Sequence, residues 1–362
     1  MDFGLSDDQK LLEETVRGFL ADKVPITRVR ELRDADCPND RAVWKQLAEM
    51  GVTGVLVPEA QGGSGLGLLD AALVAQSLGH AVTPAPFLSS AVMAPVALRE
   101  IGSDAALAEL GPIAAGDRVC GVGATETFSV REEAGIALAG GRLSGKALMV
   151  LDALHAERLL LSVGDDALAV VAGDAAGLST TRLPTTDATR CTSEVVLDGV
   201  VPEALFEGAS GAIARMLDAG RIALAADTFG ACESMISQAV AYAQQRKQFD
   251  RLIGSFQAVK HMCAEMIAEL EPARSLVWYA AHAFDALPDE APLMACHALA
   301  HVSEIGREIA SVATQVHGGI GWTDEQNLHF WFKRIGVARH LLGGPELLRE
   351  RAAALQGLAQ AS

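Results

Sequence analysis

The sequence has few cysteines, and they form no pattern that would bind a metal. Its 362 residues include six cysteines, with no C-x-x-C pair and no histidine placed to complete a metal site. They are Cys37, Cys120, Cys191, Cys232, Cys263 and Cys296. We expect small buried apolar residues in a reducing compartment, and no metal.

Long hydrophobic runs are also missing. No uninterrupted apolar run reaches the roughly 18 residues that a membrane-spanning helix needs, and no basic-then-apolar segment precedes the first predicted helix. We therefore expect a cytoplasmic protein with no membrane segment.

Positive charge is scarce as well. Lys and Arg number 29 against 46 Asp and Glu, for a formal net charge of -17. Such acidity disfavours binding to the phosphate backbone of nucleic acids and to anionic membrane surfaces. We expect neither as a partner.

Hydrophobic residues make up 50% of the chain, enough to bury a large core in two or three domains. Ser6 before Asp7 and Asp8 predicts a capped first helix, because acidic side chains favour the positive end of a helix. Apolar spacing predicts further helices at Ala42–Met50, Leu68–Leu78, Pro86–Ile101 and Asp104–Ala115. We expect a helical N-terminal domain over residues 1–115.

Helical spacing stops near residue 117. Short runs rich in Val, Leu and Thr then alternate with Gly and Asp turns, which is typical of strands. Strands are predicted at Val119–Ala124, Gly135–Ala139, Arg142–Met149, Arg158–Ser162, Ala167–Ala172, Ser179–Leu183 and Ser193–Val201. We expect a β-domain over residues 116–205.

The remaining residues, 206–362, are helical again. Wide apolar stripes on long helices predict a four-helix bundle that also buries a subunit interface. The last helical region runs through Phe332–Leu342 and Pro345–Leu355, interrupted at Gly343 and Gly344. The expected fold class is α+β, with helical, β and helical domains in order.

The glycine-rich segment Gly62–Gly67 invites comparison with a dinucleotide-binding loop. Such a loop follows a buried strand and opens a helix in a βαβ unit, whereas Val55-Leu-Val-Pro-Glu59 precedes this one. A nicotinamide-binding domain is therefore not expected.

Two separate stretches carry residues suited to a phosphate-bearing ligand. Arg246-Lys-Gln-Phe249 leads into Asp250–Gln257 at a predicted turn between helices, and Gln315–Gly321 follows an apolar helix. An Arg fork and the free N–H groups of a helix start match a phosphate, and Gly318 and Gly319 let bare backbone approach a ligand. Taken singly, each stretch is also consistent with a capped helix end or a Gly-rich turn.

Together and in this order, the two stretches resemble the C-terminal domain of the acyl-CoA dehydrogenase family. The segments Met1–Leu12, Gly54–Gly63 and Gly230–Phe249 are similar to the same family. The resemblance extends over nearly the whole chain. It implies FAD as cofactor and α,β-dehydrogenation of an acyl-CoA thioester, with electrons passed to an electron-transfer flavoprotein.

The resemblance also implies roles for particular residues. Arg246 resembles the arginine that reaches the pyrophosphate of a flavin held mostly by a neighbouring subunit. The residues that line the path of that dinucleotide are Gln248, Phe249, Ile253 and Phe256. The residues that resemble the family's adenosine contacts are Gln315 and Gly319, with Gly318 beside them. The apolar members of this set are equally consistent with core packing.

The catalytic base is missing from both positions where the family keeps it. Gly343 stands where a Glu follows the last long helix, and Gly220 stands where a Glu precedes an Arg in an earlier helix. The candidate substitutes are Asp218, which points about 200° round the helix, and Glu346, in the first turn of a helix. The catalytic residue is thus unknown from the sequence.

The β-domain departs from the family pattern too. Gly123–Phe128 replaces a Thr-Glu-Pro segment and its following loop, and Met149 and Leu151 replace a Trp and a Thr that close over the flavin ring. Two or three lost hydrogen bonds, each worth about 0.5–1.5 kcal/mol, would weaken the hold on the ring by about 10- to 1000-fold.

Two hypotheses follow. The chain is either an FAD-dependent acyl-CoA dehydrogenase with an unidentified base, acting as a homodimer or homotetramer, or a half-site subunit of a heterotetramer. In the second case it lends Arg246 and Gln315 to the flavin of a complete dehydrogenase chain. The segment Leu328–Arg334 resembles shorter bacterial members, some of which act in heteromeric complexes on steroid side chains.

Overall fold

The computed structural model describes residues 4–34, 39–129 and 131–358, so Cys37 lies outside the described part. The chain divides into two compact units that interleave along the sequence. We call Met1–Val29, Ala72–Thr83 and Leu224–Ser362 the bundle unit, and Arg30–Ala71 and Pro84–Ala223 the sheet unit. The three domain boundaries proposed from the sequence stay a prediction.

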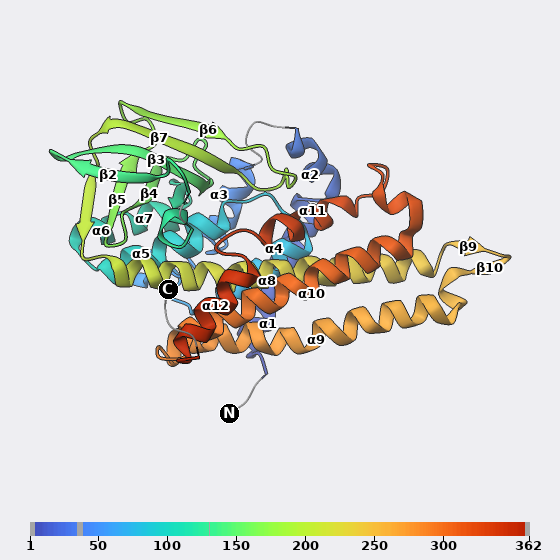
Figure 1. Ribbon diagram of the computed structural model, residues 1–362. Coiled ribbons are helices and arrows are strands. Elements are labelled where there is room, and N and C mark those ends of the chain that lie inside the picture. The colour runs from blue at the N-terminus through green and yellow to red at the C-terminus, as the bar shows by residue number, and fades with distance from the viewer. Residues whose placement is uncertain (1–3, 35–38, 130, 359–362) are drawn as a thin grey trace. The chain divides into compact units, whose positions relative to one another are not determined.

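The described residues of the sheet unit form one eight-stranded sheet in the order β6-β7-β3-β1-β4-β5-β8, with β2 paired to β3 (Figure 1). Its strands are β1 (Cys120–Gly123), β2 (Gly135–Ala139), β3 (Arg142–Leu151), β4 (Arg158–Val163), β5 (Ala167–Ala172), β6 (Leu178–Arg182), β7 (Thr192–Val200) and β8 (Ala204–Glu207). Strands β1 and β4 pair in parallel, and the other pairs are antiparallel. The chain passes from β1 to β4 through β2 and β3, so this pair is not a βαβ unit.

All seven strands predicted from the sequence are confirmed, two with the predicted ends and five with ends that shift by one or two residues. The sequence did not predict β8, which is only four residues long and is stabilised by pairing with β5. Residues Val55–Val57 lie in turns rather than a strand, which confirms that Gly62–Gly67 is not a dinucleotide-binding loop.

Short helices complete the sheet unit, and three helices continue from one unit into the other. The short ones are α3 (Arg41–Glu49), η1 (Glu59–Gln61), η2 (Phe87–Met93), α5 (Ala94–Ile101), α6 (Asp104–Ala108), α7 (Leu110–Ala114) and η3 (Thr125–Thr127). The shared ones are α2 (Ile26–Arg33), α4 (Leu68–His80) and α8 (Ser210–Ala243). The helical and mixed-sheet content confirms the α+β prediction.

Long helices make up the bundle unit. They are α1 (Asp7–Lys23), α9 (Gln257–Ala286), α10 (Ala291–His317), α11 (His329–Ala338) and α12 (Pro345–Leu355), with the short η4 (Ile253–Ser255) and η5 (Gly318–Trp322). Helix α10 packs against both α9 and α12 (Figure 1). Its apolar stripe is buried, as the spacing predicted, at Leu299, Val302, Ile305 and Ile309. Ser6 caps α1 in a reciprocal pair with Gln9, which confirms the predicted helix start.

Helices α4 and α8 cross at two glycines within the bundle unit. A Cβ added at Gly79 would lie 1.9 Å from the carbonyl oxygen of Asp227, and one at Gly230 would lie 1.9 Å from that of Gln76. The two backbones therefore touch directly, which no other residue type permits. Arg334 of α11 donates two hydrogen bonds, of 2.9 and 2.6 Å, to the buried carboxylate of Asp227 on α8.

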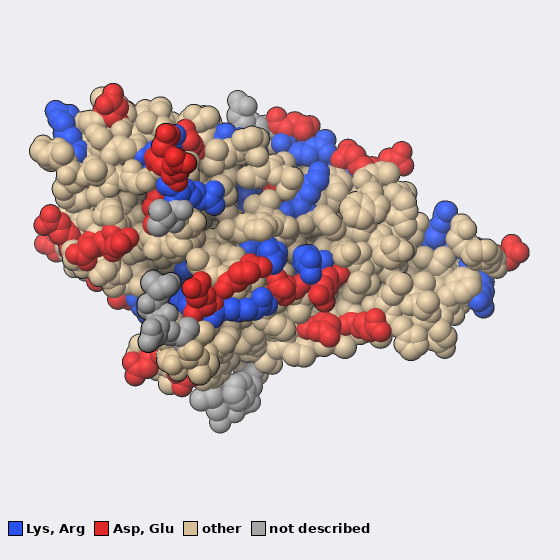
Figure 2. Space-filling model, in the orientation of Figure 1, with Lys and Arg blue, Asp and Glu red and all other residues tan. Residues whose placement is uncertain are grey.

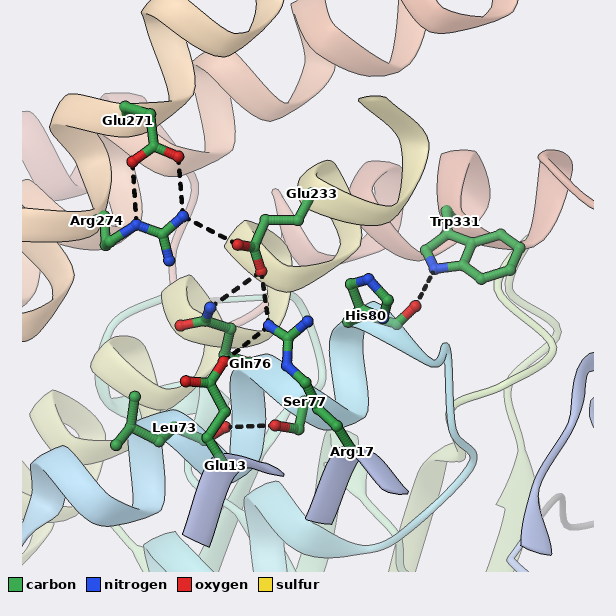
Figure 3. A network of polar contacts seen from close by, with 10 residues as sticks. All are labelled: Glu13, Arg17, Leu73, Gln76, Ser77, His80, Glu233, Glu271, Arg274 and Trp331. Carbon is green, nitrogen blue, oxygen red and sulfur yellow. Dashed lines mark hydrogen bonds and ion pairs between the residues drawn. The ribbon is translucent and has the colours of Figure 1, made fainter. Parts of the chain in front are cut away.

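One carboxylate of α8 joins four helices of the bundle unit (Figure 3). Glu233 accepts hydrogen bonds from Arg17 of α1 at 3.0 Å, Gln76 of α4 at 2.9 Å and Arg274 of α9 at 3.0 Å. Arg274 also makes two hydrogen bonds to Glu271, of 2.9 and 3.1 Å. Hydrogen bonds to charged groups contribute about 1.5–3 kcal/mol each, so this half-buried network fixes the register of α8 against its neighbours.

Four of the five described cysteines are buried as expected, namely Cys120, Cys191, Cys232 and Cys296, whereas Cys263 is only half-buried, and none of these five forms a disulfide. Burial raises the pKa of Cys120 to about 12, which keeps its thiol protonated and unreactive. In the part of the chain that the structure describes, no group of His, Cys, Asp and Glu could hold a metal ion. No helix there is long and apolar enough to span a bilayer.

Candidate functional site

The stretch after α8 is a β-hairpin, not the plain interhelical turn that the sequence predicted. Strands β9 (Lys247–Gln248) and β10 (Arg251–Leu252) pair across Phe249 and Asp250, and Figure 1 shows this hairpin at the end of the bundle unit. Both tip residues have positive φ, +52° and +61°, as a two-residue type I′ turn requires. Such turns favour Asn-Gly, and Phe249-Asp250 carries no such hairpin signal.

The hairpin presents its aromatic ring to solvent. Phe249 is 86% exposed, so the core-packing alternative is wrong for this residue. Its ring meets Phe256 edge to face at 6.2 Å, and the Arg251 guanidinium lies 3.8 Å from the centre of the Phe256 ring. Ile253 and Phe256 are half-buried at the base of the hairpin. A bulky residue held at positive φ is strained, and such strain persists mainly at functional positions.

The second predicted stretch lies at the end of α10. Gln315 is exposed in the last turn, and Gly318 ends the helix with φ +67°, a conformation that glycine adopts without strain. Nothing lies within 4 Å of a Cβ placed on Gly318 or Gly319, so both leave open space beside the backbone. This geometry fits the close approach of a ligand.

Two rings bring these stretches to the same end of the bundle. Tyr242 in the last turn of α8 stacks on His317 in the last turn of α10, with ring centres 4.6 Å apart. The backbone of Gly254 packs on Ala243, because a Cβ added at Gly254 would lie 2.9 Å from the carbonyl oxygen of Ala243. The structure thus brings together the Arg246 and Gln315 stretches, which are far apart in the sequence.

This end of the bundle has polar groups to offer a ligand. Within the described residues, no hydrogen bond or ion pair engages the exposed side chains of Arg246, Gln248 or Gln315. Lys247 and Arg251 are exposed nearby, and Figure 2 shows basic side chains at the hairpin end. A guanidinium with two amides and bare glycine backbone fits the pyrophosphate and base of a dinucleotide such as FAD.

The first candidate base is already engaged. Asp218 accepts a 2.8 Å hydrogen bond from Arg221, three residues later on α8, and both side chains are buried in the sheet unit. The Arg221 guanidinium also lies 5.8 Å from the centre of the Phe128 ring. The Asp218 carboxylate therefore compensates a buried arginine charge inside the sheet unit.

The second candidate base is exposed. Glu346 pairs with Arg339 at 2.9 Å in the first turn of α12, and Arg339 also pairs with Glu304. The backbone N–H at this helix start and the Arg339 guanidinium lower the pKa of Glu346, which weakens it as a base.

The two glycines at the family positions cannot supply a carboxylate. Gly220 is buried in α8. Gly343 has φ +99°, and a Cβ there would lie 3.0 Å from Cδ2 of Leu347. A glutamate introduced at Gly343 would therefore be strained.

In the sheet unit, a side chain of η3 bonds the backbone of β3 close to Met149. Glu126 in η3 accepts a 2.8 Å hydrogen bond from the backbone N–H of Leu148, beside an irregularity in the pairing of β3 with β7. Met149 follows with φ +53°. This backbone donor of β3 is therefore satisfied within the chain, and the weak hold on a flavin ring stays a prediction.

Replacing Asp218 by asparagine distinguishes a structural pair from a catalytic base. We expect Asp218→Asn to lower the free energy of unfolding by about 3–5 kcal/mol, because it leaves the buried charge of Arg221 without its carboxylate. Glu346→Gln, at the exposed pair, is the control and should leave the unfolding midpoint unchanged. Chemical denaturation measures both. An unchanged midpoint for Asp218→Asn would contradict the structural assignment.

Comparison with known proteins agrees with the fold. The N-terminal domain model of acyl-CoA dehydrogenases matches residues 6–117, and the C-terminal domain model matches residues 207–355. The structural neighbours include a glutaryl-CoA dehydrogenase from Mycobacterium smegmatis in complex with FADH2. The matched segments include Arg246, Gln315 and both family positions of the base.

Three similar proteins illustrate the relationship. The acyl-CoA dehydrogenase IpdE2 of Mycobacterium tuberculosis is 32% identical over 351 residues, covering 95% of this chain and 96% of that protein. A chain of the ChsE4-ChsE5 complex from Mycobacterium tuberculosis superposes with a TM-score of 0.90 at 26% identity, covering all of both chains. A chain of the Tcur3481-Tcur3483 steroid ACAD G363A variant superposes with a TM-score of 0.87 at 29% identity, covering 97% of this chain and 98% of that one. The chain is a member of the acyl-CoA dehydrogenase family of FAD-dependent oxidoreductases.

Proposed function

We propose that this chain takes part in the α,β-dehydrogenation of an acyl-CoA thioester as the subunit that reaches across to an FAD shared with a second chain. The observation that carries the proposal is the exposed end of the bundle. Arg246, Gln248 and Gln315 project there beside open glycine backbone, without a partner among the described residues. An arm of this kind suits a cofactor that lies mostly on a neighbouring subunit.

The reaction needs a positioned base. A carboxylate removes the α-proton while hydrogen bonds to the thioester oxygen stabilise the enolate. The bound FAD supplies the hydride acceptor, and we propose an electron-transfer flavoprotein as the next electron carrier. The arm residues of this chain bind and orient the cofactor but do not touch the reacting carbons.

The missing base favours a second, complete chain as partner. Asp218 is buried against Arg221, and Glu346 is exposed against Arg339. We therefore propose a heterotetramer with another acyl-CoA dehydrogenase chain, supported by the similarity to a chain of a two-component complex. A homodimer or homotetramer in which Asp218 or Glu346 acts as the base is the competing assembly.

The substrate class and compartment are part of the same proposal. Similarity to a steroid acyl-CoA dehydrogenase supports an acyl group on a bulky steroid side chain. The buried Cys120 and Cys232, which form no disulfide among the described residues, suit the reducing cytoplasm.

Removing the arm's guanidinium tests the cofactor role. We expect Arg246→Ala to weaken FAD binding by about 10- to 150-fold, the equivalent of a hydrogen bond to a charged group, about 1.5–3 kcal/mol. Lys247→Ala, in the same hairpin, is the matched control and should change the affinity much less. Titration of the apoprotein, alone or with its partner chain, gives the dissociation constant. Equal affinities in the two variants would contradict the assignment.

The activity of the chain alone tests the missing base. We expect the homo-oligomer reconstituted with FAD to be reduced slowly or not at all by saturated acyl-CoAs, because general-base assistance contributes about 10²- to 10⁴-fold. Anaerobic mixing with acyl-CoAs of several lengths, followed by flavin bleaching, measures this. Rapid bleaching that survives Gly343→Ala and Gly220→Ala but is lost in Glu346→Gln, or in an Asp218→Asn protein that circular dichroism shows to be folded, would show a complete enzyme.

A further inference from the structure

The stacked rings of Tyr242 and His317 lie beside the Arg246 and Gln315 stretches, which together make up the arm. Their planes are inclined by only 24°, and His317 is almost fully buried, at 3% exposure. Tyr242 is half-buried in the last turn of α8. Each ring thus belongs to the final turn of a long helix, just before the chain leaves it for an exposed ligand-facing segment.

One hydrogen bond fixes the imidazole. Nδ1 of His317 lies 2.8 Å from the carbonyl oxygen of Ala313, and a carbonyl only accepts, so Nδ1 carries the proton. Burial lowers the pKa of His317, so the ring is neutral at neutral pH. Two uncharged rings in an offset stack attract each other beyond the area they bury.

Backbone contacts link each ring to its neighbouring stretch, Tyr242 to the Arg246 stretch and His317 to the Gln315 stretch. The Tyr242 carbonyl accepts the N–H of Arg246 at 2.9 Å, and the Arg246 carbonyl accepts the N–H of Ile253 at 2.8 Å. On the other side, the Gln315 carbonyl accepts the N–H of Gly318. A Cβ on Gly321 would lie 3.0 Å from that of His317, so the turn after α10 packs directly on the histidine.

We propose that the Tyr242–His317 stack is a positioning element that sets the distance between the Arg246 and Gln315 stretches and thereby the affinity for the dinucleotide. This inference rests on the proposed cofactor role of the arm. The two stretches must meet different parts of one long ligand, so an error in their spacing costs affinity even when each is intact. Neither ring needs to touch the ligand.

Substitutions that keep or remove the stack test this inference. Tyr242→Phe keeps the ring and removes only a hydroxyl that bonds no described group, so FAD affinity should stay within about twofold. Tyr242→Leu and His317→Leu remove the stack, and each should weaken FAD binding by about 2- to 12-fold. The double variant should lose no more than the worse single one, because the second substitution removes a contact that is already gone.

A destabilised control separates positioning from general loss of stability. Val302→Ala creates a cavity in the buried stripe of α10, about four turns from His317, and should lower the melting temperature without changing FAD affinity. The measurements are FAD titration and thermal unfolding of the apoprotein, in the oligomer that binds FAD.

Two results would overturn the inference. In the first, Tyr242→Leu and His317→Leu keep the wild-type affinity for FAD while Arg246→Ala loses it. This result would support the cofactor role of the arm but show that the stack does not position it. In the second, the losses in the two leucine variants add independently, which shows that the rings do not act together. Wild-type affinity in Arg246→Ala itself would instead contradict the proposed function.

Discussion

The Glu233 carboxylate is the constraint on which the geometry of the bundle unit depends. Side chains from α1, α4 and α9 all converge on it, and removing it would leave Arg17 and Arg274 facing each other without their shared counter-ion. The glycine crossing of α4 and α8 sits beside it and tolerates no shift, since the backbones already touch at Gly79 and Gly230. Register and separation of α8 are therefore fixed by two independent features.

Fixing α8 matters because this helix leads into both parts of the candidate site. Its last turn carries Tyr242 and continues into the β9–β10 hairpin, whereas its first half carries Gly220 and the Asp218–Arg221 pair. The hairpin end is exposed, whereas Asp218 is held in a buried ion pair with Arg221. This contrast supports our proposal that the chain completes another subunit's site.

Local patterns were sufficient to predict most of the fold. Ser6 and Gln9 form the predicted helix start, and alternation rich in Val and Leu located the strands, because both signals lie within a few neighbouring residues. Features that depend on distant partners were missed. Strand β8 needs β5, the hairpin has Phe249-Asp250 instead of Asn-Gly, and nothing in the spacing of Tyr242 and His317 indicates that their rings meet.

The most direct test of the central claim is the flavin content of the chain purified alone. Its visible spectrum, with and without added FAD, would be compared with that of the chain coexpressed with a second acyl-CoA dehydrogenase subunit. Our account predicts a nearly colourless protein alone and a stably yellow complex. One tightly bound FAD per chain in the isolated homo-oligomer would contradict it.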